Sequence, residues 1–104
     1  SRTDEYYWFE IIFSSIVYGA SAYLPYDGGG AGYTALGIPA RYGVVAVDPD
    51  IIPLGTRVYI PGYGEAIAAD TGGAINGYMI DLCMEDYTQA IAFGRRGVEV
   101  YILD

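Results

Sequence analysis

Three aspartates in apolar or glycine-rich surroundings are the residues of this chain best suited to chemistry. Asp48 and Asp70 each close an apolar run, and Asp81 lies inside one, between Ile80 and Leu82. Apolar neighbours that remove a carboxyl group from water make it hold its proton more tightly, and such an acid is useful near neutral pH. Carboxylates that are brought close together also repel each other, so one of them should stay protonated. The pattern therefore indicates general acid and base chemistry.

A glycine-rich loop joins two of these acids. Between Asp70 and Asp81 the chain passes through residues 71–77, where glycine occupies positions 72, 73 and 77. Glycine adopts backbone angles that other residues resist, so this loop can bend sharply and let a ligand approach the main chain. The simpler interpretation is that both aspartates only cap turns beside these glycines.

The composition leaves carboxylates, hydroxyls and backbone amides to carry any chemistry. The chain has no histidine, which excludes Ser-His-Asp and Cys-His catalysis and the common zinc sites. The single cysteine, Cys83, cannot form an internal disulfide, and its apolar run favours a small core residue. The net charge is −8 and all five basic residues are arginine, so nucleic acid is not an expected partner, because phosphate binding needs a basic face.

Short strands between proline and glycine turns must position the three acids. The 104 residues, 53% of them hydrophobic, are enough for one small domain with a single core. Apolar and alternating runs predict strands at 11–17, 43–47, 56–60, 65–69, 80–84 and 97–103. Residues 61–64 form the predicted turn of a hairpin. Strand ends on one side of a small barrel would bring Asp48, Asp70 and Asp81 together.

One helix is predicted from Asp86 to Phe93. Asp86 is a good N-cap, Gly94 ends the helix, and Arg95 and Arg96 lie at the negative end of its dipole. An inward-facing stripe is expected from the helical spacing of its apolar residues, which are Tyr87, Ala90, Ile91 and Phe93.

The first 17 residues are predicted to be an extension of a barrel domain that spans residues 18–104. The segment from Tyr6 to Val17 is rich in aromatic side chains, which would leave a large apolar patch in water unless they pack onto the barrel. A second copy of the chain could cover the same patch, so a monomer and a homodimer both stay open. The apolar stretch is too short and too polar to span a membrane.

Four segments of the sequence resemble the 3D domain, a family named for its three aspartates. They read VAVDP at 45–49, IPLGTRVYI at 52–60, ADTGGAI at 69–75 and IDL at 80–82, and the resemblance covers about residues 18–103. The family is similar to the catalytic barrel of MltA-type lytic transglycosylases. The resemblance implies an all-β fold, a small six-stranded double-psi β-barrel with one short helix.

The resemblance also implies an activity. It is the cleavage of peptidoglycan glycan strands between N-acetylmuramic acid and N-acetylglucosamine, leaving a 1,6-anhydro sugar. Asp81 matches the family's catalytic acid, Asp70 matches the acid that neighbours it, and Asp48 matches the first of the three. One acid would protonate the glycosidic oxygen and then accept the proton of the attacking C6 hydroxyl. The implied substrate contacts are Thr34, Thr71, Gly72, Gly73 and Asn76.

No cofactor or metal is implied by the resemblance, and the implied location is extracytoplasmic, in a bacterial cell wall or secreted. The family loop usually continues with lysine where this chain has Asn76, which keeps a hydrogen bond but loses a charge. This departure keeps open a non-catalytic module, either natural or engineered, that binds glycan without cleaving it. A small Ca²⁺ or Mg²⁺ site built from the three aspartates is a third hypothesis.

Overall fold

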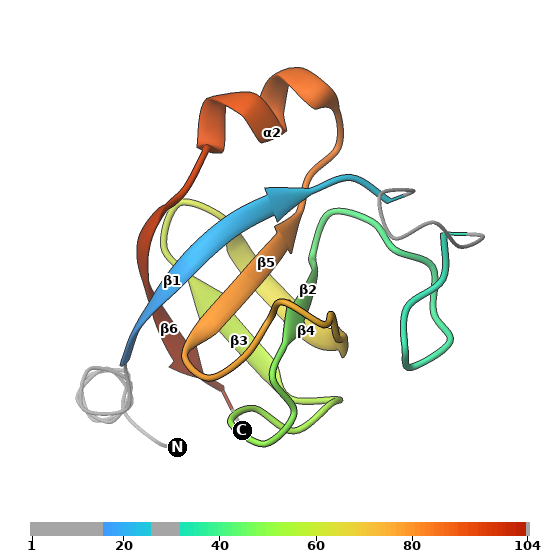
Figure 1. Cartoon of the computed structure of the whole chain (residues 1–104), viewed down its shortest axis with the longest axis vertical. Coiled ribbons are helices and arrows are strands. Elements are labelled where there is room, and N and C mark those ends of the chain that lie inside the picture. Colours follow the sequence, from blue (N-terminus) through green and yellow to red (C-terminus); the bar gives the residue numbers. More distant parts are fainter. Residues whose placement is uncertain (1–15, 26–31, 104) are drawn as a thin grey trace, which may run out of the picture.

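A closed six-stranded barrel with one helix against its outside is the fold of this chain, as seen in a computed structural model that describes residues 16–25 and 32–103 (Figure 1). The strands are β1 (Ile16–Tyr23), β2 (Val44–Val47), β3 (Arg57–Ile60), β4 (Gly64–Asp70), β5 (Met79–Cys83) and β6 (Arg96–Ile102). The helix is α2 (Tyr87–Phe93). The predicted all-β class is confirmed, and from residue 43 onward the predicted strand limits agree with the observed ones to within one residue.

The strands close around the barrel in the order β1-β5-β2-β4-β3-β6, with β6 bonded back to β1. β1 pairs in parallel with β5, and β2 pairs in parallel with β4, whereas the other pairs are antiparallel. Closure leaves no unpaired strand edge in the barrel. It also places β1 beside β5, so that residues 60 positions apart in sequence become neighbours.

The core fills the inside of this barrel with aliphatic side chains. Ile80 and Leu82 of β5, like Val58 and Ile60 of β3, are at most 1% exposed, and the residues between them are more exposed. This alternation is the one that a strand with one buried face requires. Each buried aliphatic side chain contributes about 1.5–3 kcal/mol. The other face of the wall is thereby free to carry polar groups.

The predicted hairpin between β3 and β4 is confirmed. Ile60 pairs with Gly64 across the turn, and Tyr63 N donates to the Ile60 carbonyl at 2.9 Å. Gly62 has a φ of 86° and Gly64 a φ of 114°. Side chains with a Cβ rarely adopt these angles, so glycine at both positions fixes the turn and with it the register of the two strands.

The helix forms where it was predicted, but its buried side is narrower than predicted. The Asp86 carboxylate accepts a hydrogen bond from Gln89 N, and Gly94 N donates to the Ala90 carbonyl. Ala90 and Phe93 pack against the core. The inward stripe is wrong at the other two positions, because Tyr87 is 69% exposed and Ile91 is 61% exposed.

The reason for this narrow contact is the closed barrel, which completes most of its core without the helix. The seven-residue helix contacts β1 and lies beyond the ends of β1 and β5 (Figure 1). The predicted position of the arginines is confirmed for Arg96. Its guanidinium donates to the carbonyls of Ala92 and Phe93 at the helix end, as expected for a cation at the negative end of a helix.

The predicted packing of Tyr6 to Val17 on the barrel and the predicted strand at 11–17 lie outside the described residues, except at Ile16 and Val17. Both stay predictions, and the alternative of a homodimer is likewise untested. β1 itself begins at Ile16. Within the described ranges, no helix combines the length and the apolarity that crossing a bilayer would need.

Candidate active site

A row of four residues crosses the outer face of the barrel wall and contains two of the predicted acids. Ser21 of β1 pairs with Asp81 of β5, Asp81 pairs with Ala46 of β2, and Ala46 pairs with Asp70 of β4. Paired residues on adjacent strands point to the same face of a sheet. Asp81 and Asp70 therefore lie on either side of Ala46, two strand spacings or about 10 Å apart along the wall.

A β-bulge in β4 turns Asp70 toward this outer face. Ala66 and Ala68 belong to the barrel core, so strict alternation would point Asp70 inward as well. The register with β2 instead shifts after Val45, which pairs with Ala68, so that Ala46 pairs with Asp70. One extra residue, Ala69, changes the face on which the following side chain lies, as bulges near functional sites do.

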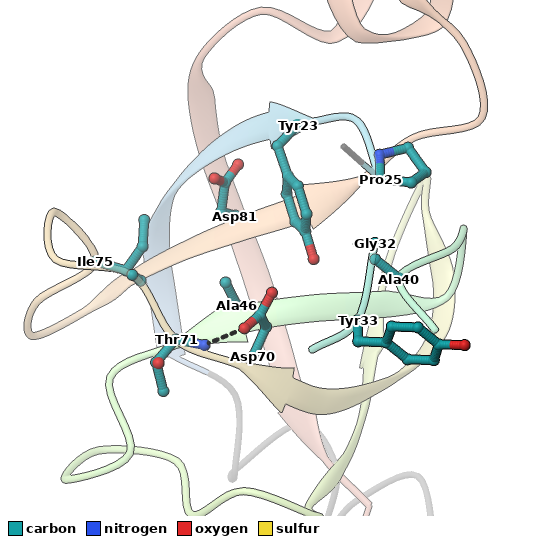
Figure 2. Close-up of a pocket in the computed structure, with 11 residues that line it drawn as sticks. Tyr23, Pro25, Gly32, Tyr33, Ala40, Ala46, Asp70, Thr71, Ile75 and Asp81 are labelled. Atoms are coloured by element: carbon teal, nitrogen blue, oxygen red, sulfur yellow. Dashed lines mark hydrogen bonds between the residues drawn. The ribbon is translucent and has the colours of Figure 1, made fainter. Parts of the chain in front are cut away.

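Three residues of the row, Ala46, Asp70 and Asp81, line a cavity of about 290 Å³, close to the lower limit of common ligand pockets. The segment between β1 and β2 supplies the opposite wall, and the loop after β4 supplies one end (Figure 2). The lining residues from these elements are Tyr23, Pro25, Gly32, Tyr33, Ala40, Ala46, Asp70, Thr71, Gly72, Ile75 and Asp81. None of them is basic, so the cavity favours neutral or cationic ligands.

Backbone amides hold the Asp70 carboxylate in place. Its Oδ1 atom accepts hydrogen bonds from Thr71 N at 2.9 Å and from Ala35 N at 3.1 Å. Leu36 N donates to the Ala69 carbonyl at 3.0 Å directly beside them. The end of β4 is thus fastened to the loop around residue 35, which closes one side of the cavity.

A hydroxyl group helps to orient Asp81. The Ser21 Oγ atom donates to Asp81 Oδ1 at 2.9 Å. The neighbours Ile80 and Leu82 point into the core and are almost fully buried, so strand alternation directs Asp81 outward into the cavity (Figure 2). Sequence reasoning missed Ser21, because only the pairing of β1 with β5 reveals its position.

The structure does not bring Asp48 to the other two aspartates. It follows β2 outside the cavity, where its Oδ2 accepts from Gly77 N at 2.7 Å and its Oδ1 accepts from Asp50 N at 3.0 Å. These two bonds, the one from Gly77 above all, lower the pKa of the Asp48 carboxyl below its usual value. Asp48 therefore links its own turn to the loop that leads from Asp70 to Asp81.

The predicted substrate contacts divide into two groups. Thr71 and Gly72 line the cavity, whereas Gly73, Asn76 and Thr34 do not. The Thr34 side chain is buried, and its hydroxyl donates to the Ile38 carbonyl at 2.9 Å. The Asn76 amide donates to the Gly73 carbonyl at 3.0 Å within its own loop.

Two tyrosines that sequence reasoning did not single out line the cavity. Tyr23 extends from the end of β1 with its hydroxyl directed toward Asp70, and Tyr33 lies at the mouth with 65% of its surface exposed (Figure 2). The chain has 12 tyrosines, so residue type alone did not distinguish these two. Within residues 16–25 and 32–103, no three acidic or thiol side chains lie together as the ligands of a metal would.

Comparison with known proteins places this geometry in context. The family model of the 3D domain matches residues 43–104. The crystal structure of MltA from Escherichia coli, described as having a unique lytic transglycosylase fold, superposes with a TM-score of 0.56 and 24% identity over 69% of this chain and 27% of that one. This likeness shows that the barrel has the fold found in MltA.

Two curated relatives from Bacillus subtilis (strain 168) are similar in sequence. The cell wall-binding protein YocH is 48% identical over 89 residues, which are 82% of this chain and 31% of that protein. The putative cell wall shaping protein YabE is 42% identical over 89 residues, again 82% of this chain and 22% of that protein. The chain thus spans less than a third of the length of either relative.

Proposed function

Because the chain belongs to the 3D domain family, we propose that its barrel acts on the glycan strands of the bacterial cell wall and cleaves them by a lytic transglycosylase reaction. The observation that carries the proposal is the placement of Asp81 and Asp70 in one cavity of about 290 Å³ on a barrel with the fold of MltA. The names of the two relatives support a cell-wall substrate. An extracytoplasmic location, at or in the wall, follows from the same proposal.

In the proposed reaction, Asp81 is the group that moves the proton. As an acid it donates its proton to the glycosidic oxygen while the bond from that oxygen to C1 of the muramic acid breaks. As a carboxylate it then accepts the proton of the C6 hydroxyl, whose oxygen forms the new bond to C1. The carboxyl group returns to its starting state and no water is consumed. A second carboxylate placed to activate water, as in a hydrolase, is therefore not needed.

The hydrogen bonds of the two acids support this assignment of roles. Ser21 can donate to the Asp81 carboxylate or accept from its protonated form, so it serves both stages of the proton cycle. Asp70 Oδ1 accepts hydrogen bonds from two backbone N–H groups, and an ionised carboxylate, which only accepts hydrogen bonds, suits these two donors. Asp70 in this proposal supplies fixed negative charge, which stabilises the positive charge that develops at C1 during cleavage.

The test is digestion of purified sacculi with the wild type and with Asp81→Asn, followed by mass analysis of the released fragments. The wild type should release fragments with 1,6-anhydromuramic ends. Asp81→Asn should release none, while its melting temperature and its binding to glycan stay close to those of the wild type, because size and most hydrogen bonds are kept. Asp70→Asn should retain part of the activity. Equal release by wild type and Asp81→Asn would refute the assignment, and reducing ends would indicate hydrolysis.

A second candidate function is glycan binding without cleavage. It is favoured by the name of YocH, a cell wall-binding protein, and by Asn76 at the position where the family usually has lysine. Under this alternative, the wild type binds sacculi but releases nothing. Asn76→Lys is then the next variant, because cleavage gained by that single change would show that only the cation is missing.

A further inference from the structure

The hydroxyl of Tyr23 is a buried polar group that the described part of the chain leaves without a hydrogen-bond partner. Buried polar groups are nearly always hydrogen-bonded, and one that is not costs free energy in the folded state. Tyr23 also lines the cavity that holds Asp70 and Asp81. An unpaired group at this place suggests that its partner is a ligand.

The position of Tyr23 follows from the last residue of β1. Tyr23 pairs with Cys83, two residues beyond the pair of Ser21 and Asp81, so its side chain lies on the same outer face as the acids. Figure 2 shows its ring beside Asp81 and its hydroxyl extending into the space above Asp70. Because the hydroxyl oxygen is itself buried, a group bound between the two acids meets it once the residues that line the cavity shift to admit the group.

The hydroxyl stays protonated there. Burial raises the pKa of Tyr23 well above its usual range, and the nearby charges of Asp70 and Asp81 act in the same direction. The phenol can therefore donate one hydrogen bond and accept another. Since none of the described residues that line the cavity is basic, the cavity disfavours anionic partners. A hydroxyl, ring or amide oxygen of a neutral sugar fits both conditions.

We propose that Tyr23 is a glycan-binding residue, whose hydroxyl donates a hydrogen bond to a neutral oxygen of the sugar held between Asp70 and Asp81. The inference rests on the proposed function in taking a glycan as the ligand. It goes further by assigning a contact to a residue outside the three aspartates and the glycine loop. Tyr23 orients the sugar and takes no part in the transfer of the proton.

Tyr63 provides a matched control within the same chain. It is a buried tyrosine, 6% exposed, whose hydroxyl, like that of Tyr23, lies inside the protein, but it does not line the cavity. Its hydroxyl donates to the Cys83 carbonyl at 2.6 Å and accepts from Gly43 N at 2.7 Å. Its hydrogen bonds are therefore satisfied inside the protein, in contrast with those of Tyr23.

The experiment compares Tyr23→Phe and Tyr63→Phe with the wild type in two measurements, the melting temperature and the affinity for N-acetylglucosamine hexamer by calorimetry. Tyr23→Phe should leave the melting temperature unchanged or higher, because it removes an unsatisfied polar group. It should weaken binding of the hexamer about 3- to 10-fold, the value of one ordinary hydrogen bond. Tyr63→Phe should lower the melting temperature and leave the affinity of the folded protein unchanged.

Two results would overturn the inference: a hexamer affinity that Tyr23→Phe does not change, or a loss of melting temperature in Tyr23→Phe as large as in Tyr63→Phe. Digestion of sacculi, run in parallel, separates this outcome from failure of the proposed function. If binding depends on Tyr23 but no cleavage occurs, the inference about Tyr23 stands and the proposed cleavage is refuted. If the wild type cleaves but Tyr23→Phe binds the hexamer equally well, the proposed function stands and the inference about Tyr23 is refuted. No binding and no cleavage by the wild type would refute both.

Discussion

At the scale of single residues, the three aspartates have different surroundings and hence different uses. Asp81 is oriented by a hydroxyl, Asp70 is held by backbone amides at the cavity, and Asp48 is held by backbone amides away from it. The contact of Asp81 with Ser21 suits a group that must exist in both protonation states, because the Ser21 hydroxyl can reverse its role. In the function proposed here, Asp81 therefore carries the proton, Asp70 supplies a fixed charge, and Asp48 has a structural role as an acceptor of backbone hydrogen bonds.

The structural role of Asp48 predicts a pH-dependent stability. Its pKa is lowered in the folded protein by the bonds from Gly77 N and Asp50 N. A lowered carboxyl pKa stabilises the fold above the unfolded value, about 3.9, and this stabilisation is lost as the pH falls through the folded value. Asp48→Asn should therefore lower the melting temperature at pH 7, with a difference from the wild type that shrinks below about pH 4.

The measurement is thermal unfolding followed by circular dichroism between pH 7 and pH 2.5. Asp50→Asn is the matched control, since it removes the same charge from an exposed side chain two residues away. A difference between wild type and Asp48→Asn that is as large at pH 3 as at pH 7 would contradict the prediction.

At the scale of elements, two local features position the site. The bulge at the end of β4 directs Asp70 outward, and the parallel pairing of β1 with β5 brings Ser21 and Tyr23 to the acids. The helix α2 stands apart from this arrangement, because it contacts β1 beyond the strand ends and none of its residues lines the cavity. A change that destabilises α2 should therefore leave binding and cleavage in the cavity unchanged.

The N-cap of α2 tests this separation. Asp86 Oδ1 accepts from Gln89 N at 2.8 Å, and the Gln89 side chain accepts from Glu85 N at 2.7 Å. Asp86→Ala removes the cap and should lower the free energy of unfolding by about 1 kcal/mol, as measured by urea denaturation. Asp86→Ser should lower the free energy of unfolding much less, because serine is also a good N-cap residue. Both variants should bind and cleave glycan like the wild type, and a loss of activity in Asp86→Ala at a temperature where it is folded would show that helix and cavity are coupled.

At the scale of the whole molecule, the dominant property is a net charge of −8 on 104 residues. Such an excess destabilises the compact state through self-repulsion. The ion pair between Arg57 and Glu65 offsets little of it, since the two charged atoms are 3.9 Å apart and both side chains are largely exposed. Salt that screens the charges should consequently stabilise the fold.

We expect the melting temperature to rise when sodium chloride is increased from about 10 mM to about 200 mM, as the screening length falls from about 30 Å to below 10 Å. Hexamer binding should change little over the same range, because the proposed ligand is neutral. Differential scanning calorimetry gives the first quantity and titration calorimetry the second. A melting temperature that falls with salt would mean that favourable charge pairs outweigh the repulsion.

The sequence by itself determined the elements that depend on near neighbours. Alternation placed the strands from residue 43 onward, Gly62 and Gly64 marked the hairpin, and Asp86 and Gly94 marked the ends of the helix. The same local pattern predicted that Asp81 points away from the core. These features could be read from the sequence because each depends on side chains a few positions apart.

The tertiary structure alone decided which distant groups meet. The closed barrel pairs Ser21 with Asp81, leaves Tyr87 and Ile91 of the helix in water, and keeps Asp48 away from the cavity. Strict alternation would point Asp70 into the core, and the bulge in β4 instead turns it to the outer face. Strand register joins residues tens of positions apart, and a shift by one residue moves a side chain to the opposite face, so no local pattern contains this information.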